Sequence, residues 1–443
     1  MATRLPNLWQ ENFLTAGIPF VFNAYTTALP GAPIPFQNTF VALTLPPAYN
    51  TQGQLIFPHE RSEEVRPNTQ FDLQRFQDDL AAMTPGHQIQ LPNAVGIAAD
   101  FNNGSIGSYR LAIDHGFGNL SASASYVATV GIHLPSVYSP NSYSGADSAF
   151  APFTTFDSTG HPIGGYGSES LISSESHSSY HSLQTSISNK SAWAGLQMQA
   201  SYTYSKSLDD TSSVLGGLFG TAGVILQALP QNPWDPGAEK GPSTFDSTHA
   251  FTLSLIEFLP LDRVSFFRPL VKILTSGWQV LSITTLTSGP PFTVFSGIQQ
   301  TGVGAGGTDR PDLIEKPRLS TGRTNRADYF GRAANNTSFF NIPINIPGGS
   351  GPNQGRFGTL GRDTFRGPGF HNFDIALIKD TSIGHRKSGG ELATIQFRAE
   401  FFNIFNIVNF GLPSNIVRGS GFGVISKTAG SSRQIQFSLK LVY

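Results

Sequence analysis

The end of the chain, RQIQFSLKLVY (433–443), alternates between apolar and polar side chains. One face collects Ile435, Phe437, Leu439, Leu441 and Tyr443, and the other collects Gln434, Gln436, Ser438 and Lys440. A period of two residues is typical of a β-strand with one apolar and one polar face. We therefore expect a strand here, whose apolar face meets either a second sheet or lipid.

Other segments share this pattern or a strand-like composition. They are 109–117, 119–128, 182–189, 195–207, 250–258, 277–289, 372–380 and 393–405, of which 277–289 alternates least cleanly. Each is near the length of about ten residues that crosses a bilayer as a tilted strand. Helical periodicity is scarce, and FDLQRFQDDLAAM (71–83) is the best candidate for a short helix or turn.

The connections between these segments alternate in length along the chain. Those at 118, 190–194 and 381–392 are short, that at 259–276 is moderate, and those at 129–181, 206–249, 290–371 and 406–432 are long. Outer-membrane barrels have short periplasmic turns and longer external loops. The sequence therefore predicts an all-β, antiparallel transmembrane β-barrel with Tyr443 at the periplasmic end.

Composition supports this fold and excludes several functions. Charged residues make up 13% of the chain, about half the share of a typical soluble domain. The net charge of −1 gives no basic face for nucleic acid. The absence of cysteine excludes disulfides, Cys-ligated zinc and thiol nucleophiles. The N-terminal MATRLPNLWQENFLTAG lacks the pattern of a secretory signal.

Two regions differ in character. Residues 1–104 are rich in proline and apolar side chains, and we expect an irregular, loop-like segment with few strands there. Residues 105–443 contain the alternating segments, and we expect them to form the transmembrane strands.

Several stretches resemble one known family. They are SYRLAIDHGFGNLSASASYVATVGIHLP (108–135), YHSLQTSISNKSAWAGLQMQASYTYSKSLDD (180–210), NPWDPGAEKGPSTFDSTHAFTLSLIEFLP (232–260), GWQVLSITTLTSGPPFTV (277–294), FGTLGRDTFRGPGFHNFDIALIKD (357–380) and FRAEFFNIFNIVNFGLP (397–413). In order and spacing they resemble TonB-dependent outer-membrane receptors of the Oar-like class, which carry a carboxypeptidase-regulatory-like domain. The resemblance covers about 105–443.

The resemblance implies a barrel of about 22 strands, closed by an N-terminal plug, with uptake powered by the TonB complex. It also implies that the terminal strand, through Ile435, Phe437, Leu439, Leu441 and Tyr443, faces outer-membrane lipid and is recognised by the barrel-assembly machinery. Signal peptide, plug, TonB box and regulatory-like domain are not seen in this chain. We therefore expect the C-terminal part of such a receptor, either as a gene fragment or as one product of a split gene whose plug and remaining barrel are encoded separately.

Polar positions on the expected strands are candidates to line a lumen. They are Gln197, Gln199, Gln396, Arg398, Glu400, Gln434, Gln436 and Lys440. Arg398 and Glu400 share one strand face, so we expect them to form an ion-pair network with Lys440 on a neighbouring strand. Each of these residues could equally only hydrate or brace the lumen.

No motif supports an enzyme, a cofactor or a metal. GVGAGG (302–307) matches a dinucleotide pattern, but it lacks the flanking strand and helix. His177 and His181 in HSSYH, and Asp209 and Asp210 in SLDDTSS, could bind a metal, but we expect solvated external loops there. Asp157 and Asp246, in two FDST segments, are expected to have turn or loop-packing roles.

Two alternatives to the receptor remain open at this point. One is a small, self-closing porin-like or structural barrel of the outer membrane. The other is a secreted all-β adhesin whose apolar faces pack sheet against sheet.

Overall fold

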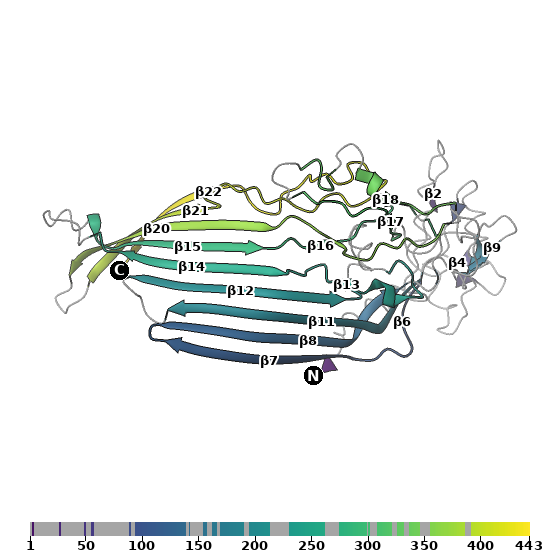
Figure 1. The fold of residues 1–443 in the computed structure, drawn as a ribbon, viewed down its shortest axis with the longest axis horizontal. Helices are drawn as coiled ribbons and strands as arrows, with labels where there is room; N and C mark the ends of the chain where they lie inside the picture. Colours follow the sequence, from purple (N-terminus) through teal and green to yellow (C-terminus); the bar gives the residue numbers. More distant parts are fainter. Residues whose placement is uncertain are drawn as a thin grey trace.

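The computed structural model contains one dominant, 12-stranded sheet (Figure 1). The structure describes residues 94–138, 141, 154–156, 162–165, 169–189, 195–212, 230–261, 274–298, 300–301, 308–320, 326–331, 336–345, 355–385 and 391–443, and five two-residue strands before residue 90. The possible helix at 71–83, the GVGAGG segment, Asp157 and nearly all of 1–93 lie outside the described residues.

The long strands follow one another across the sheet in chain order, and each long strand is antiparallel to its neighbours in this order. They are β7 (Gly104–Phe117), β8 (Leu120–Tyr138), β11 (Glu169–Asn189), β12 (Leu196–Asp209), β14 (His249–Leu259), β15 (Trp278–Thr287), β20 (Phe370–His385), β21 (Glu391–Phe402) and β22 (Gln434–Val442). Each alternating segment of the sequence falls on one of these strands, so the predicted all-β, antiparallel fold is confirmed.

Shorter elements complete the described chain. Three join the large sheet: β1 (Ala2–Thr3), β6 (Ala94–Ile97) and β13 (Gly241–Pro242). The others form separate pairs: β2 (Thr26–Thr27) with β5 (Gln88–Ile89), β3 (Ala48–Tyr49) with β4 (Leu55–Ile56), β9 (Thr154–Phe156) with β10 (Pro162–Gly165), β16 (Pro291–Phe292) with β19 (Phe365–Arg366), and β17 (Asp312–Leu313) with β18 (Phe340–Asn341). The 3₁₀ helices are η2 (Pro236–Glu239) and η4 (Asn336–Phe339). Among the described residues, no helix is long and apolar enough to cross a membrane.

One expectation about the loops is wrong. His177 and His181 lie on strand β11, which begins at Glu169, and not in an external loop. Serine hydroxyls along this strand pair with neighbouring strands, as in the 2.7 Å contact between the Oγ atoms of Ser136 and Ser173. A serine-rich sequence can therefore remain extended here, because its side chains satisfy one another across the sheet.

Short and long connections lie at opposite ends of the sheet (Figure 1). The β7–β8 turn, the β14–β15 connection and the C-terminus lie at one end, and β16, β17 and β18 lie toward the other. Gly118 adopts a φ of 57° in the β7–β8 turn, a conformation that glycine adopts without steric cost. The alternating loop lengths of the sequence thus correspond to the two ends of one sheet.

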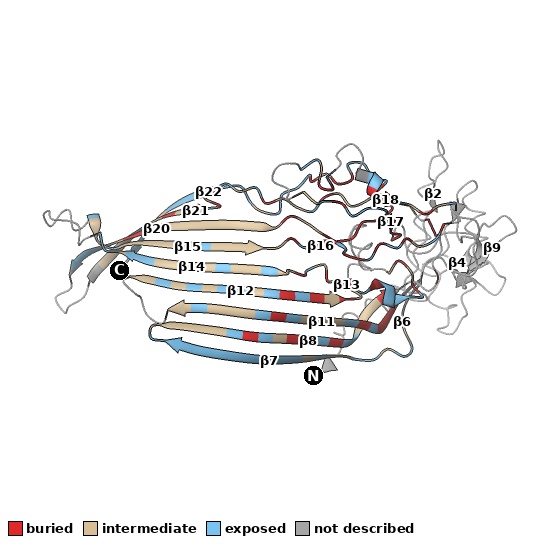
Figure 2. Ribbon diagram, viewed as in Figure 1, coloured by how far each residue is buried: buried red, intermediate tan, exposed pale blue. Residues whose placement is uncertain are grey.

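The pairing register separates the sheet into two faces, because directly opposed residues share a face. The apolar face includes Leu111, opposite Tyr126, and Ala200, opposite both Ile187 and Leu253. Large side chains stay exposed on it, most of all on β7 and β22 (Figure 2); Leu111 is 71% exposed and Leu439 is 72% exposed. A contiguous apolar surface of this kind is unusual for a protein in water.

Strands β7 and β22 form the two ends of the ordered path of long strands. Strand β22 pairs with β21, and β7 pairs with β8 and, at two positions, with β1. Within the described part of the chain, β7 and β22 do not pair with each other. The sheet is therefore open as described.

Candidate functional site

The face opposite the apolar one is lined by hydroxyl and amide groups on β8, β11 and β12. Oγ of Ser123 lies 2.8 Å from Oγ of Ser186, and Ser186 is directly opposite Ser201. We call this side of the sheet the polar face. Gln197 and Gln199 lie on it, exposed, with Gln199 between Ser188 and Ser254. They line a hollow of about 400 Å³ together with Ser188, Asn189, Met198, Ser254 and Ile256.

The other candidate residues lie on β21 and β22. The register places Gln396 opposite Lys440, and Glu400 opposite Gln436, while Gln434 lies opposite Phe402 at the loop end. Arg398 Nη2 donates to Glu400 Oε1 over 2.8 Å, as expected. The described contacts do not include an ion pair of Lys440 with either residue, so the expected three-member network is wrong in that part. Asp380 instead accepts hydrogen bonds from Gln396, at 2.9 Å, and from Gln279, at 3.1 Å.

The polar face is interrupted by apolar side chains on β14 and β15. Ile256 is directly opposite Leu281, and Ile283, two residues along β15, is opposite Ser254. We call the four apolar residues Ile256, Phe258, Leu281 and Ile283 the inner patch. Phe258 is 43% exposed and Ile283 is 50% exposed. This part of the sheet is thus apolar on a face that is polar elsewhere.

The long connections pack together at one end of the sheet and form a hydrophobic core of their own. We call residues 230–248, 288–298, 300–301, 308–320, 326–331, 336–345, 355–369 and 403–433 the loop cluster. Its buried core contains Phe292, Val294, Tyr329, Phe330, Phe339, Phe340, Leu360, Phe365, Val417, Phe422 and Ile425. At its centre, the ring of Phe330 stacks on Phe422 with centroids 4.9 Å apart and meets Phe340 and Phe365 edge-on, each at 5.6 Å.

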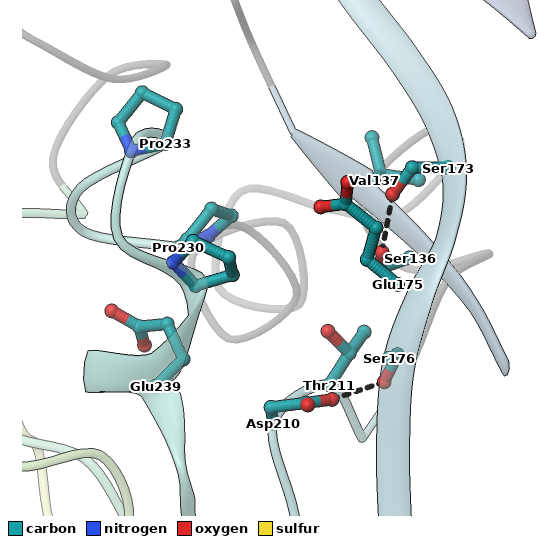
Figure 3. A pocket seen from close by; sticks show the side chains of 11 residues that line it. Ser136, Val137, Ser173, Glu175, Ser176, Asp210, Thr211, Pro230, Pro233 and Glu239 are labelled. Atoms are coloured by element: carbon teal, nitrogen blue, oxygen red, sulfur yellow. Dashed lines mark hydrogen bonds between the residues drawn. The ribbon is translucent and has the colours of Figure 1, made fainter. Parts of the chain in front are cut away.

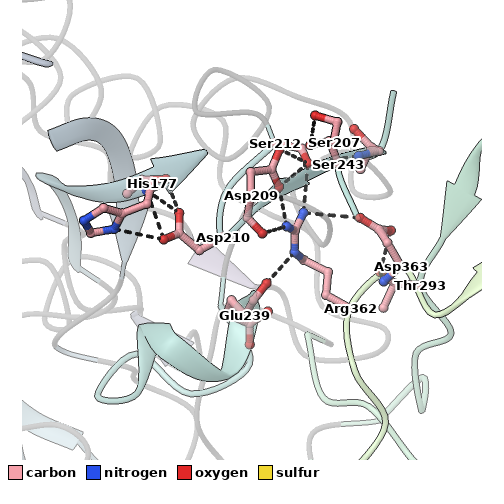
Figure 4. Close-up of polar contacts among 12 residues, drawn as sticks. His177, Ser207, Asp209, Asp210, Ser212, Glu239, Ser243, Thr293, Arg362 and Asp363 are labelled. Carbon is pink, nitrogen blue, oxygen red and sulfur yellow. Dashed lines mark hydrogen bonds and ion pairs between the residues drawn. The ribbon is translucent and has the colours of Figure 1, made fainter. Parts of the chain in front are cut away.

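A buried arginine joins two segments of the loop cluster, 230–248 and 355–369, to the end of β12 (Figure 4). Arg362 Nη2 binds a carboxylate oxygen of Asp209, and Nη1 contacts Asp363 at 3.2 Å. Nε donates to the carbonyl of Glu239 at 2.9 Å, and Nη1 donates to Ser212 Oγ at 2.8 Å. Because these groups are buried, the charges are compensated within the protein and not by water.

A second buried pair crosses the same region. Arg310 binds Glu239 in a bidentate arrangement, with N–O distances of 2.6 and 2.8 Å. Gln231 supports both partners, since its backbone N–H donates to Glu239 and its side-chain oxygen accepts from the backbone N–H of Arg310. Asp246 binds Arg366 and accepts from the N–H of Ser207 at 2.6 Å, so it has the packing role expected for it.

The candidate calcium ligands are engaged in protein contacts. Asp209 binds Arg362, while Asp210 accepts from Ser176 Oγ and from the backbone N–H of His177 (Figure 4). No group of three or more His, Asp or Glu that could hold a metal occurs among the residues that the structure describes. A cavity beside these groups measures only about 30 Å³ and is lined in part by Glu175, Asp210 and Glu239 (Figure 3). This is room for little more than water.

Asp309 gives the loop cluster a pH-dependent stability. Burial raises the pKa of its carboxyl to about 6, although hydrogen bonds from the N–H and hydroxyl of Thr301 and the charge of Arg310 oppose this rise. A raised folded-state pKa contributes stability that is present below the ordinary value of 3.8 and is lost as the pH rises through about 6. Burial also raises the pKa of Asp363, against the opposing charge of Arg362, so its contribution has the same sign.

We expect the loop cluster to resist protease better at about pH 5 than at about pH 7.5, and Asp309→Asn to reduce this difference. Susceptibility to a protease active at both pH values, measured on outer-membrane vesicles in increasing urea, tests this. Asp235→Asn, in an exposed position, is the control. An unchanged pH difference in Asp309→Asn would contradict the assignment.

Comparison with known proteins identifies the fold family. The family model of the outer membrane beta barrel domain matches residues 22–436. The chain belongs to this family. The protein is therefore an outer-membrane β-barrel protein, located in the outer membrane, and a secreted adhesin is excluded.

No curated protein matches the chain. Among solved structures, the chain is similar to the outer membrane transporter YddB from Escherichia coli, with a TM-score of 0.40 and 10% sequence identity. The match covers 80% of this chain and 34% of that chain. The chain thus spans about a third of the length of that structure.

Proposed function

We propose that this chain forms part of the wall of a plugged, TonB-dependent transporter of the outer membrane. In outer-membrane barrels the outer face contacts lipid and the inner face is polar. The exposed apolar face then lies against lipid, and the polar face, with Gln197, Gln199, Arg398 and Glu400, lines the lumen. The resemblance of several segments to TonB-dependent receptors of the Oar-like class supports the energy-coupled function.

The inner patch is the observation that carries this proposal. In an open, water-filled pore, Phe258 and Ile283 would remain in contact with water at considerable cost, about 25 cal/mol for each Å² of apolar surface. A plug domain inside the lumen would cover them. Barrels with plugged lumens are a recognised class distinct from open porins.

Because the sheet is open, we infer that the complete barrel contains more strands than the structure describes. In hydrocarbon an unpaired backbone group costs several kcal/mol, so β7 and β22 both require neighbouring strands in the membrane. We propose that a plug-bearing barrel half supplies them. The terminal strand, with Phe437, Leu439 and Tyr443 on its apolar face, would present the signal for the barrel-assembly machinery.

Planar-bilayer conductance tests the plugged lumen. The protein is isolated from its native outer membrane together with whatever chains accompany it. We expect no steady conductance from the native protein and a leak from Ile283→Asn, because the polar amide weakens the contact between plug and wall. Ser254→Asn is the matched control, since it lies on the same face directly opposite Ile283. Steady conductance in the native protein would favour the self-closing porin-like barrel.

Crosslinking in intact cells tests the energy coupling separately. Formaldehyde treatment followed by purification of this chain should recover TonB, either directly or through a plug-bearing partner. A closed lumen without TonB would support a structural barrel, so the two experiments distinguish the alternatives.

A further inference from the structure

Two tyrosine–histidine pairs lie on the apolar face, toward the loop end of the strands. The hydroxyl of Tyr126 lies 2.7 Å from Nδ1 of His181, and the hydroxyl of Tyr202 lies 2.8 Å from Nδ1 of His249. Tyr204 packs against the ring of His249, with centroids 5.3 Å apart. Because a tyrosine hydroxyl occupies Nδ1 of each imidazole, Nε2 of each remains to contact a ligand.

A lysine accompanies these histidines. Lys206 is directly opposite His181 on the neighbouring strand, and Tyr204, two residues before it, is directly opposite His249. Directly opposed Cα atoms lie about 5 Å apart and diagonal neighbours about 7–8 Å, so Lys206 lies close to both histidines. Lys206 is exposed and makes no hydrogen bond or ion pair among the contacts of the described residues.

The nearby carboxylates already bind other residues. Asp210 binds the backbone N–H and the imidazole of His177, which lies four residues toward the loop end from His181. Asp209 binds Arg362 within the loop cluster. Among the described residues, Lys206, His181 and His249 therefore have no carboxylate partner.

The position of these residues along the strand indicates what they meet. On the apolar face of β12, Leu196, Met198 and Ala200 are followed by Tyr202 and Tyr204, and then by Lys206. In outer-membrane barrels, apolar residues contact the hydrocarbon and tyrosines lie in the interfacial girdle, so a lysine beyond them lies at the lipid headgroups. Since the short turns and the C-terminus lie at the periplasmic end, this boundary is that of the outer leaflet.

We propose that Lys206, His181 and His249 bind a phosphate group of an outer-leaflet lipid. The ammonium of Lys206 supplies the positive charge, and Nε2 of each imidazole supplies a hydrogen-bond donor when it carries a proton. The tyrosine hydroxyls hold both rings in place, which reduces the ordering cost of binding. The inference requires the outer-membrane location of the protein, lipid against its apolar face and an outward-facing loop end, but it does not require the proposed transport function.

Retention of defined lipids by the purified full-length protein tests this site. The probes are bisphosphorylated lipid A and its fully dephosphorylated form, presented in the same detergent micelles and measured by native mass spectrometry. We expect the native protein to prefer the phosphorylated lipid, and Lys206→Gln/His181→Gln to bind it about tenfold more weakly. Raising the salt concentration should reduce the difference in lipid affinity between the native protein and the double variant.

Two further variants keep the result interpretable. Lys440→Gln removes a lysine from the polar face and should leave lipid binding unchanged, whereas Lys206→Arg should preserve most of it. Heat-modifiable migration on gels establishes that each variant is folded. Equal retention of the phosphorylated and dephosphorylated lipids by the native protein, or equal affinity in the folded double variant, would overturn the proposal.

Discussion

Arg362→Met will loosen the loop cluster while leaving the sheet in place. Arg362 compensates the buried carboxylates of Asp209 and Asp363 and binds the carbonyl of Glu239. Methionine fills much of the same volume but leaves an uncompensated buried charge, which costs about 3–5 kcal/mol. Limited proteolysis of outer-membrane vesicles should show faster cleavage in the loop cluster, while heat-modifiable migration of the barrel stays unchanged.

An exposed arginine–aspartate pair provides the control for this experiment. Arg356 binds Asp312 at 2.7 Å, but its side chain is 48% exposed, and exposed pairs contribute about 0–1 kcal/mol. Arg356→Met should therefore change cleavage little. Adding Asp209→Leu to Arg362→Met should recover part of the lost protection, because the orphaned charge is removed. Equal cleavage in native protein and Arg362→Met would show that the buried network does not hold the loops.

The transmembrane strands could be predicted from the sequence because lipid and water impose opposite demands on alternate residues. Apolar and polar residues alternate clearly in RQIQFSLKLVY and GLQMQASYTYSKS, and both segments form strands with the expected faces. The loop lengths also indicated which connections share an end of the sheet, since successive connections of an antiparallel sheet lie at alternate ends.

The inner patch was harder to predict from the sequence than the transmembrane strands were. In WQVLSITTLT, β15 has Leu281 and Ile283 on the polar face, whereas Ser282 and Thr284 share the other face with Leu255 and Leu253. The alternation is therefore inverted and weak in this strand. A strand whose two faces both meet protein or lipid gives no clear period of two.

The loop cluster could not be predicted because it has no repeating pattern and depends on distant contacts. The atoms that join Arg362 to Asp209 belong to residues 153 apart in the sequence. One signal was present: NPWDPGAEKG and GRDTFRGPG concentrate charges within long loops of a chain with few charged residues. Glu239, Arg362, Asp363 and Arg366 come from these segments, and all four form buried or partly buried ion pairs.

Phe330→Ala should have the second large effect, through the apolar core of the loop cluster and not through its charges. Phe330 is fully buried, and its ring contacts Phe340, Phe365 and Phe422. Truncation to alanine removes the apolar contacts and leaves a cavity, at a cost of about 3–5 kcal/mol. Hydrogen exchange should then accelerate at backbone amides across the cluster, because segments that share one core open together.

A matched substitution separates this packing effect from a general response to losing a phenylalanine. Phe405 is 65% exposed and lies at the edge of the cluster, where its ring contacts Phe373 on β20. Phe405→Ala should leave hydrogen exchange in the cluster nearly unchanged, since little buried surface is lost. If Phe330→Ala accelerated exchange only at its immediate neighbours, the cluster would be a set of independently folded loops. Accelerated exchange that extends beyond these neighbours in both the 290–371 loop and the 406–432 loop would instead show that the two loops share one cooperative core, which holds the loop end of the sheet in a single arrangement.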